Sequence, residues 1–273
     1  MKTVSGVAGR ALRWLGVALL ALPLGTGAQE DVPFVVTPDA VTLAMLELAQ
    51  VGPGDFVLDL GSGDGRIVIN AARRYGARGL GVEIVPELVQ RSRIDAERAG
   101  VAARARFVEQ DLFKTDLSVA TVITMYLLQE VNLQLRPALL GLKPGTRIVS
   151  HDWDLGDWRP DRSRVIDVPD KPVGREKLSR LHLWVVPARL QGDWCGHGAH
   201  AGARLQLRQQ FQLFDATLSR GGASLLLAGR IEGVRLRAGG GFEAVAEGSR
   251  LRVHSAGPTP AAWVGAEFER CAG

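Results

Sequence analysis

A strand, glycine loop and helix pattern near residue 60 constrains the fold of this chain more than any other feature. Residues 56–60 form an apolar run, residues 61–65 carry glycine at alternate positions, and residues 67–75 have helical periodicity. Further apolar runs at 79–83, 106–110, 120–128 and 146–150 alternate with helical stretches at 86–99 and 131–142. This alternation predicts an α/β fold, a Rossmann-like parallel sheet with helices on both faces.

The texture of the sequence changes after Pro187. Residues 177–186 still alternate apolar and polar side chains, which predicts an antiparallel edge hairpin that completes the sheet. Beyond them glycine becomes frequent, and short alternating runs recur at 205–213, 224–227, 233–237, 249–253 and 263–268. We therefore expect two domains, an α/β domain over 33–186 and a small all-β domain over 187–273.

The glycine loop lies between a strand and a helix, where its backbone can approach a ligand. Gly61, Gly63 and Gly65 alternate with Ser62 and one acid, and Asp59 stands two residues before the first glycine. A dinucleotide site has a different glycine spacing and places a pyrophosphate on the helix N-terminus. An acid in this position suits an ammonium group, such as that of S-adenosylmethionine (SAM), whose carboxylate can use the loop amides.

Two more acids follow strands in the same relation. Glu83 ends the second apolar run about 20 residues after the loop, where it can accept hydrogen bonds from ribose hydroxyls. Asp111, followed by Leu112, comes after the third run and could receive an adenine amino group. Strand-end acids also cap helices, and for any single one that reading is equally good. Three together with the glycine pattern favour a SAM site.

These residues resemble the class I SAM-dependent methyltransferases, and more narrowly the ATP synthase c-subunit lysine methyltransferase family with its bacterial relatives. The resemblance is carried by segment 33–38 (PFVVTP), segment 59–68 (DLGSGDGRIV) and segment 127–132 (LLQEVN). It implies SAM as cofactor, with Thr37 closing over it and Tyr126 facing the methyl group. The simpler readings are that Thr37 caps a helix whose first residue is Pro38, and that Tyr126 packs in the core.

Methyl transfer requires no particular catalytic side chain, because the sulfonium is already activated and the enzyme mainly aligns the reactants. A lysine acceptor must first lose a proton, which at pH 7 costs about 4.6 kcal/mol. Polar groups near the expected strand ends that could assist are Tyr126, Glu130, His151 and Asp152. The alternative for the stretch around His151 and Asp152 is a solvated polar loop.

The first 28 residues have a basic start, an apolar run from Trp14 to Leu24 and a small-residue stretch before Gln29. This pattern predicts a cleaved signal peptide and an exported or periplasmic protein. An apolar run of about 11 to 15 residues is short for a bilayer core of ~30 Å, although a membrane anchor remains the alternative. Export conflicts with the cytoplasmic supply of SAM. A retained anchor with unusual orientation would resolve the conflict, as would a start codon near Met45 and a cytoplasmic protein, although the second would delete segment 33–38.

The charge balance and the cysteine content limit which partners and metals are expected. Three of the 33 basic residues lie in the leader, so 30 bases face 29 acids in the rest, and no nucleic-acid partner is expected. Cys195 and Cys271, the two cysteines, predict one disulfide in an oxidising compartment. Zinc bound by them with His197 and His200 is a weaker alternative, and we expect no metal.

The sequence thus predicts SAM-dependent methylation of a nitrogen, with a protein lysine as first choice of acceptor. A small-molecule methyltransferase is the alternative within enzymes. An exported binding protein that retains the fold without turnover is the alternative outside them. The β domain would recruit a protein or envelope partner, and the leader would allow membrane association.

Overall fold

The computed structural model describes residues 36–171, 176–257 and 263–271. The predicted leader at 1–28 and the first part of segment 33–38 lie outside these residues. Among the described residues, no helix is both long and apolar enough to cross a bilayer.

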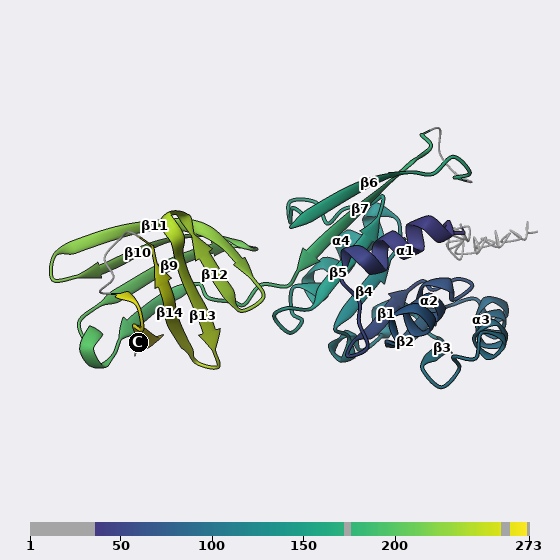
Figure 1. Cartoon of the computed structure of the whole chain (residues 1–273), viewed down its shortest axis with the longest axis horizontal. Coiled ribbons are helices and arrows are strands. Elements are labelled where there is room, and N and C mark those ends of the chain that lie inside the picture. Colours follow the sequence, from purple (N-terminus) through teal and green to yellow (C-terminus); the bar gives the residue numbers. More distant parts are fainter. Residues whose placement is uncertain (1–35, 172–175, 258–262, 272–273) are drawn as a thin grey trace, which may run out of the picture. The chain divides into compact units, whose positions relative to one another are not determined.

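A seven-stranded mixed sheet forms the first half of the fold, as predicted (Figure 1). Its order is β3-β2-β1-β4-β5-β7-β6. The first five strands pair in parallel, and β7 pairs antiparallel with both β5 and β6. The bounds are β1 Phe56–Leu60, β2 Arg78–Glu83, β3 Ala105–Glu109, β4 Val122–Met125, β5 Arg147–His151, β6 Arg162–Asp167 and β7 Leu178–Val185.

Four helices cover the two faces of this sheet, namely α1 (Asp39–Leu48), α2 (Arg66–Tyr75), α3 (Pro86–Arg98) and α4 (Gln129–Leu139). Successive residues of a strand point to opposite faces. Val57 accordingly packs with residues of α1 and α2, whereas Leu58 packs with Leu135 and Leu139 of α4. The core of α3 joins that of α2 through Val68. Helices on both faces are therefore confirmed.

The edge of the sheet differs from the prediction. Residues 178–185 are antiparallel, as expected, but they form β7, which lies inside the sheet between β5 and β6. The edge strand is β6, which the sequence did not reveal because its side chains are nearly all exposed. A strand with one partner and no buried face lacks the alternation that identifies strands.

The second half of the fold is a closed antiparallel barrel in which each strand pairs with the next and β15 returns to β8. Its strands are β8 Gly192–Gly196, β9 Arg204–Gln210, β10 Leu213–Arg220, β11 Ala223–Glu232, β12 Arg235–Ala238, β13 Phe242–Glu247, β14 Arg250–Ala256 and β15 Glu267–Arg270. The all-β class is confirmed. The strands β8, β10 and β13 had no separate signal in the sequence pattern.

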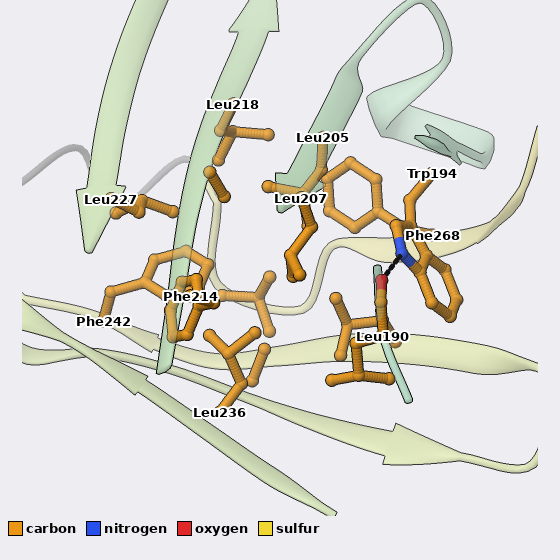
Figure 2. Packing of buried hydrophobic residues seen from close by; sticks show 14 of the residues in the cluster. Leu190, Trp194, Leu205, Leu207, Phe214, Leu218, Leu227, Leu236, Phe242 and Phe268 are labelled. Carbon is orange, nitrogen blue, oxygen red and sulfur yellow. Dashed lines mark hydrogen bonds between the residues drawn. The ribbon is translucent and has the colours of Figure 1, made fainter. Parts of the chain in front are cut away.

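Large apolar side chains fill the barrel, as expected for a closed eight-stranded sheet of this size. Figure 2 shows Phe214, Phe242 and Phe268 converging with leucines from neighbouring strands. Trp194 is 3% exposed, and its indole nitrogen donates a hydrogen bond of 2.8 Å to the Leu190 carbonyl (Figure 2). The barrel interior is therefore a packed core.

Candidate functional site

The loop after β1 depends on glycines in the left-handed region of backbone space. The φ angle is 73° at Gly61, 54° at Gly63 and 78° at Gly65, a conformation that is costly for other residues. Space is also short, because a Cβ on Gly61 would lie 2.9 Å from a Leu127 methyl group and one on Gly65 would lie 2.6 Å from the Phe107 ring. The chain therefore makes a tight turn at the carboxyl end of β1, where parallel sheets bind ligands.

Asp59 is buried at the end of β1, with 2% of its surface exposed. Thr124 on β4 donates a hydrogen bond of 2.6 Å to its carboxylate. Burial raises the pKa of Asp59 to about 7, which the Thr124 hydrogen bond opposes and the negative charges of Glu83 and Asp64 reinforce. A carboxylate in this situation is stabilised by a cationic ligand. Thr124 is a residue that sequence reasoning missed.

Glu83 joins the end of β2 to the glycine loop. One carboxylate oxygen accepts a hydrogen bond of 2.9 Å from the Gly63 amide, and the other accepts from the amides of Ile84 and Val85 at 2.8 and 3.1 Å. A carboxylate offers about four acceptor positions, so these bonds leave about one. The two ribose hydrogen bonds expected at Glu83 would both form only if a loop amide moved.

Asp111 shows the capping role that the sequence left as an alternative. Its carboxylate accepts a hydrogen bond of 2.9 Å from the Phe113 amide and so caps the short helix Leu112–Lys114. The Lys114 ammonium lies 3.6 Å from the other carboxylate oxygen. Leu112 is partly buried against the core on the α4 side of the sheet. Asp111 is thus placed at the expected strand end, with one oxygen engaged by backbone.

Thr37 is buried beside the loop, but it does not cap α1. The helix begins at Asp39, its N-cap is Pro38, and it has no side-chain cap, so the capping alternative was wrong. Instead the Thr37 carbonyl accepts a hydrogen bond of 2.6 Å from Arg66, whose guanidinium also binds the Asp64 carboxylate at 2.6 Å. This clamp, which the sequence analysis missed, ties the chain before α1 to the glycine loop.

The register of β1, β4 and β5 places the start of the glycine loop, Tyr126 and His151 at the same height along the strands. Leu60 pairs with Met125 on β4, and Met125 pairs with Ser150 on β5. The next residue of each strand is therefore Gly61, Tyr126 and His151 respectively. Because the three strands are adjacent and parallel, these residues lie side by side at the carboxyl edge of the sheet.

His151 is fully buried, contrary to the solvated-loop alternative. Its ring centroid lies 3.9 Å from that of Tyr126, with the two planes 32° apart. Its Nε2 lies 2.8 Å from the Ser179 hydroxyl on β7 and 3.4 Å from the Asp152 carboxylate. Lys171 binds the same Asp152 oxygen at 2.6 Å. Ser179 and Lys171 carried no motif signal. The antiparallel pairing of β5 and β7 brings Ser179 here, and Lys171 comes from the segment between β6 and β7.

Glu130 is exposed in the first turn of α4 and makes no hydrogen bond or ion pair within the described residues. The structure therefore does not bring it into the cluster around His151. The buried member of segment 127–132 is Asn132, whose amide nitrogen binds the Ser150 hydroxyl at 3.1 Å and the Trp153 carbonyl at 3.2 Å. Asn132 holds the turn after β5 against α4.

Cys195 and Cys271 form a disulfide that joins β8 to the residue after β15. This is the first of the two alternatives drawn from the sequence. The disulfide consumes both thiols of the zinc set, and within the described ranges no three His, Cys, Asp or Glu residues are grouped to hold a metal ion.

The residues at the carboxyl edge fit SAM on structural grounds. The glycine turn leaves no room for side chains, the buried Asp59 calls for a cation, and Ser62 has a buried hydroxyl without a hydrogen-bond partner among the described residues. SAM carries a sulfonium, an ammonium, a carboxylate and ribose hydroxyls. Asp59 suits the ammonium and Glu83 suits the ribose hydroxyls, whereas the acids at this edge disfavour a pyrophosphate-bearing dinucleotide. The amides of Gly61, Ser62, Gly63 and Gly65 are already hydrogen-bonded within the protein.

Comparison with known proteins agrees with this geometry. Residues 59–162 match the family model described as the ANTKMT methyltransferase domain. A protein-lysine N-methyltransferase of Saccharolobus islandicus is 46% identical over 141 residues, covering 51% of this chain and 86% of that protein. The lysine N-methyltransferase of the mouse ATP synthase c-subunit is 35% identical, covering 59% of this chain and 64% of the relative.

A solved structure gives the same result for the fold. The RNA methyltransferase from Salinibacter ruber, crystallised with S-adenosyl-L-homocysteine, is 49% identical and superposes with a TM-score of 0.52. The match covers 57% of this chain and 96% of that one. Its sequence likeness and its bound cofactor product support a SAM site in this fold.

Proposed function

Because this chain belongs to the SAM-dependent protein-lysine methyltransferase family, we propose that it transfers a methyl group from SAM to the side-chain nitrogen of a lysine in a protein. The observation that carries the proposal is the alignment of Gly61, Tyr126 and His151 at neighbouring strand ends. An amine that reaches the loop across β4 would meet Tyr126, which is partly exposed, whereas His151 is buried.

The cofactor-side residues have separate roles in this proposal. Asp59 pairs with the ammonium of the methionine part, and Glu83 accepts from the ribose. The Ser62 hydroxyl is buried against Gly81 of β2 and has no hydrogen-bond partner among the described residues. When bound, SAM supplies a methyl group already activated by its sulfonium. The protein must therefore align the acceptor nitrogen and keep the loop dry.

Tyr126 is the residue placed to orient the acceptor nitrogen. Burial, and after it the negative charge of Asp152, raises the pKa of the Tyr126 phenol above its ordinary value of 10.0. The phenol is therefore protonated at neutral pH, and its oxygen can still accept a hydrogen bond from a neutral amine. Loss of the lysine proton costs about 4.6 kcal/mol at pH 7, so the rate should rise with pH toward alkaline values.

The proposal is tested with SAM carrying an isotopic methyl label and a whole-cell bacterial lysate as the acceptor mixture. After acid hydrolysis of the protein fraction, label in Nε-methyllysine supports the proposal. Label found in nucleosides of digested RNA would show that RNA, and not a protein lysine, is the acceptor. Label found only in small molecules would favour a small-molecule methyltransferase. A paired Asp59→Ala and Glu83→Ala control should remove all incorporation.

We also propose that the barrel works in an oxidising compartment. The Cys195–Cys271 disulfide supports this, because cytosolic thiols are normally kept reduced. The test is alkylation of free thiols in the protein as isolated from its native cells, followed by mass measurement. Full alkylation of both cysteines would contradict an oxidising location.

A further inference from the structure

The acceptor side of the site contains a buried histidine that the proposed chemistry has not yet used. His151 has no exposed surface, and its Nδ1 has no hydrogen-bond partner within the described part of the chain. A buried imidazole cannot touch an incoming amine directly. Its closest ring neighbour is Tyr126, at 3.9 Å between centroids. Of its contacts, the one with Tyr126 connects His151 to the ring proposed to orient the acceptor nitrogen.

The imidazole is held from the side opposite its free nitrogen. The Ser179 hydroxyl lies 2.8 Å from Nε2, and the Asp152 carboxylate lies 3.4 Å from the same atom. Asp152 has a left-handed backbone, with φ of 63°, and accepts a hydrogen bond of 3.0 Å from the Arg180 amide. Lys171 donates hydrogen bonds of 2.6 Å to Asp152 and to the Leu178 carbonyl. Ser179, Asp152 and Lys171 together form the histidine clamp.

The imidazole is neutral at physiological pH, mainly because it is buried. Burial lowers the pKa of His151 to about 4, which outweighs the opposing effect of the Asp152 carboxylate, while Lys171 lowers it further. Asp152 and Lys171 carry opposite charges and pair with each other. The ring beneath Tyr126 therefore adds no positive charge to a site that must admit an amine next to a sulfonium.

We propose that His151 is a positioning residue for Tyr126, a clamped neutral ring that holds the phenol beside the glycine loop. The inference rests on the proposed lysine methylation for its meaning, but the placement of Tyr126 can be measured without any acceptor. Ring contact, rather than proton transfer, is the property that His151 contributes.

Three variants separate these properties. His151→Phe keeps a flat ring against Tyr126 and removes the hydrogen bonds. His151→Gln keeps a polar group within reach of Ser179 and removes the ring. Ser179→Ala removes the anchor and leaves the imidazole. Thermal unfolding of each variant shows whether it remains folded, and SAM binding by calorimetry shows whether the cofactor side is intact.

The first readout is the NMR signal of the Tyr126 ring in protein labelled with [¹³C]tyrosine. The chain has two tyrosines, so a Tyr75→Phe background leaves Tyr126 as the one labelled ring. In His151→Gln the signal should shift and broaden, in His151→Phe it should stay sharp, and in Ser179→Ala it should broaden partly. An unchanged signal in His151→Gln would overturn the proposal whatever the acceptor is.

The second readout is methyl transfer to the lysine acceptor that the labelling experiment identifies. The value of kcat should fall about tenfold in His151→Gln and stay within about threefold in His151→Phe, with SAM affinity unchanged in both. In a Tyr126→Ala background the His151→Gln change should cause no further loss. Additive losses, or an active His151→Gln beside an inactive His151→Phe, would mean that His151 acts through its nitrogens and would refute ring positioning.

Discussion

Replacing Asp59 with asparagine should stabilise the ligand-free protein at neutral pH and not at acid pH. The reason is the burial of its carboxylate, whose pKa rises from 3.8 to about 7 in the folded state. Between these values the folded protein binds a proton that the unfolded chain releases. The contribution of Asp59 to stability is therefore complete below pH 3.8 and is lost as pH rises to 7.

The size of the effect follows from the shift. A change of about three pKa units corresponds to about 4 kcal/mol, an order-of-magnitude upper figure for a buried carboxylate. Asparagine resembles protonated aspartate in shape and keeps an oxygen that can accept from Thr124. Asp59→Asn should therefore match the wild type at pH 4 and exceed it in free energy of unfolding by up to about 4 kcal/mol at pH 8.

The assay is urea unfolding of both proteins at pH values from 4 to 8, analysed as a difference so that other carboxylates cancel. Asp64→Asn is the matched control on the same loop. Burial there raises the Asp64 pKa, but the hydrogen bonds and charge of Arg66 outweigh it and lower the pKa overall. The contribution of Asp64 is nearly complete above pH 3.8 and is lost only as pH falls through its lowered folded-state pKa. Asp64→Asn should hence be less stable than the wild type by a nearly constant amount from pH 4 to 8, with the opposite sign from Asp59→Asn. A difference for Asp59→Asn that is flat with pH would refute the reasoning.

The same Asp59→Asn protein should bind SAM weakly, since it lacks the carboxylate charge that would pair with the ammonium. Wild-type affinity for SAM should rise between pH 5 and 7 as Asp59 ionises, and isothermal calorimetry across this range checks both statements. Gly61→Ala should lose about 1–2 kcal/mol of stability in denaturant titration from its positive φ and the contact with Leu127. Gly54→Ala, where a Cβ meets nothing within 4 Å, should be neutral. Reduction of the Cys195–Cys271 disulfide, which spans 76 residues, should destabilise the barrel by about 4 kcal/mol, seen as a lower barrel melting temperature in reductant; an unchanged melting temperature would contradict it.

The sequence predicted the parallel half of the sheet and its loop because these features are local. The central strands β1 and β4 are mostly apolar, and the glycines stand directly between β1 and α2. The all-β tail was predicted from alternation alone, but β8 has glycine at both ends and a single buried side chain, so it shows no alternation. The sequence did not predict β6 either, because its side chains are nearly all exposed and so show no apolar and polar alternation.

Individual acids were less predictable than the loop. Asp59, Glu83 and Asp111 occupy equivalent places in the sequence, yet their surroundings differ. Asp59 has a hydroxyl partner and a raised pKa, Glu83 is engaged by three amides, and Asp111 caps a short helix. For Glu83 and Asp111 the difference comes from the turn after the strand, whereas for Asp59 it comes from burial and from Thr124 on the neighbouring strand β4. A sequence position shows that an acid is at the edge of the sheet, and the local turn decides how many of its lone pairs remain for a ligand.

The acceptor side was hardest to predict because its contacts are long-range. His151 was expected in or near a polar loop, but β5 extends through it and β7 covers it in antiparallel register. Ser179 lies 28 residues away in the chain from the imidazole that it holds. Tyr126 and His151 become neighbours only because β4 and β5 end at one level beside β1. The ring pair is therefore a product of sheet register, so a one-residue insertion in β4 should separate Tyr126 from both His151 and the glycine loop while leaving the loop sequence intact.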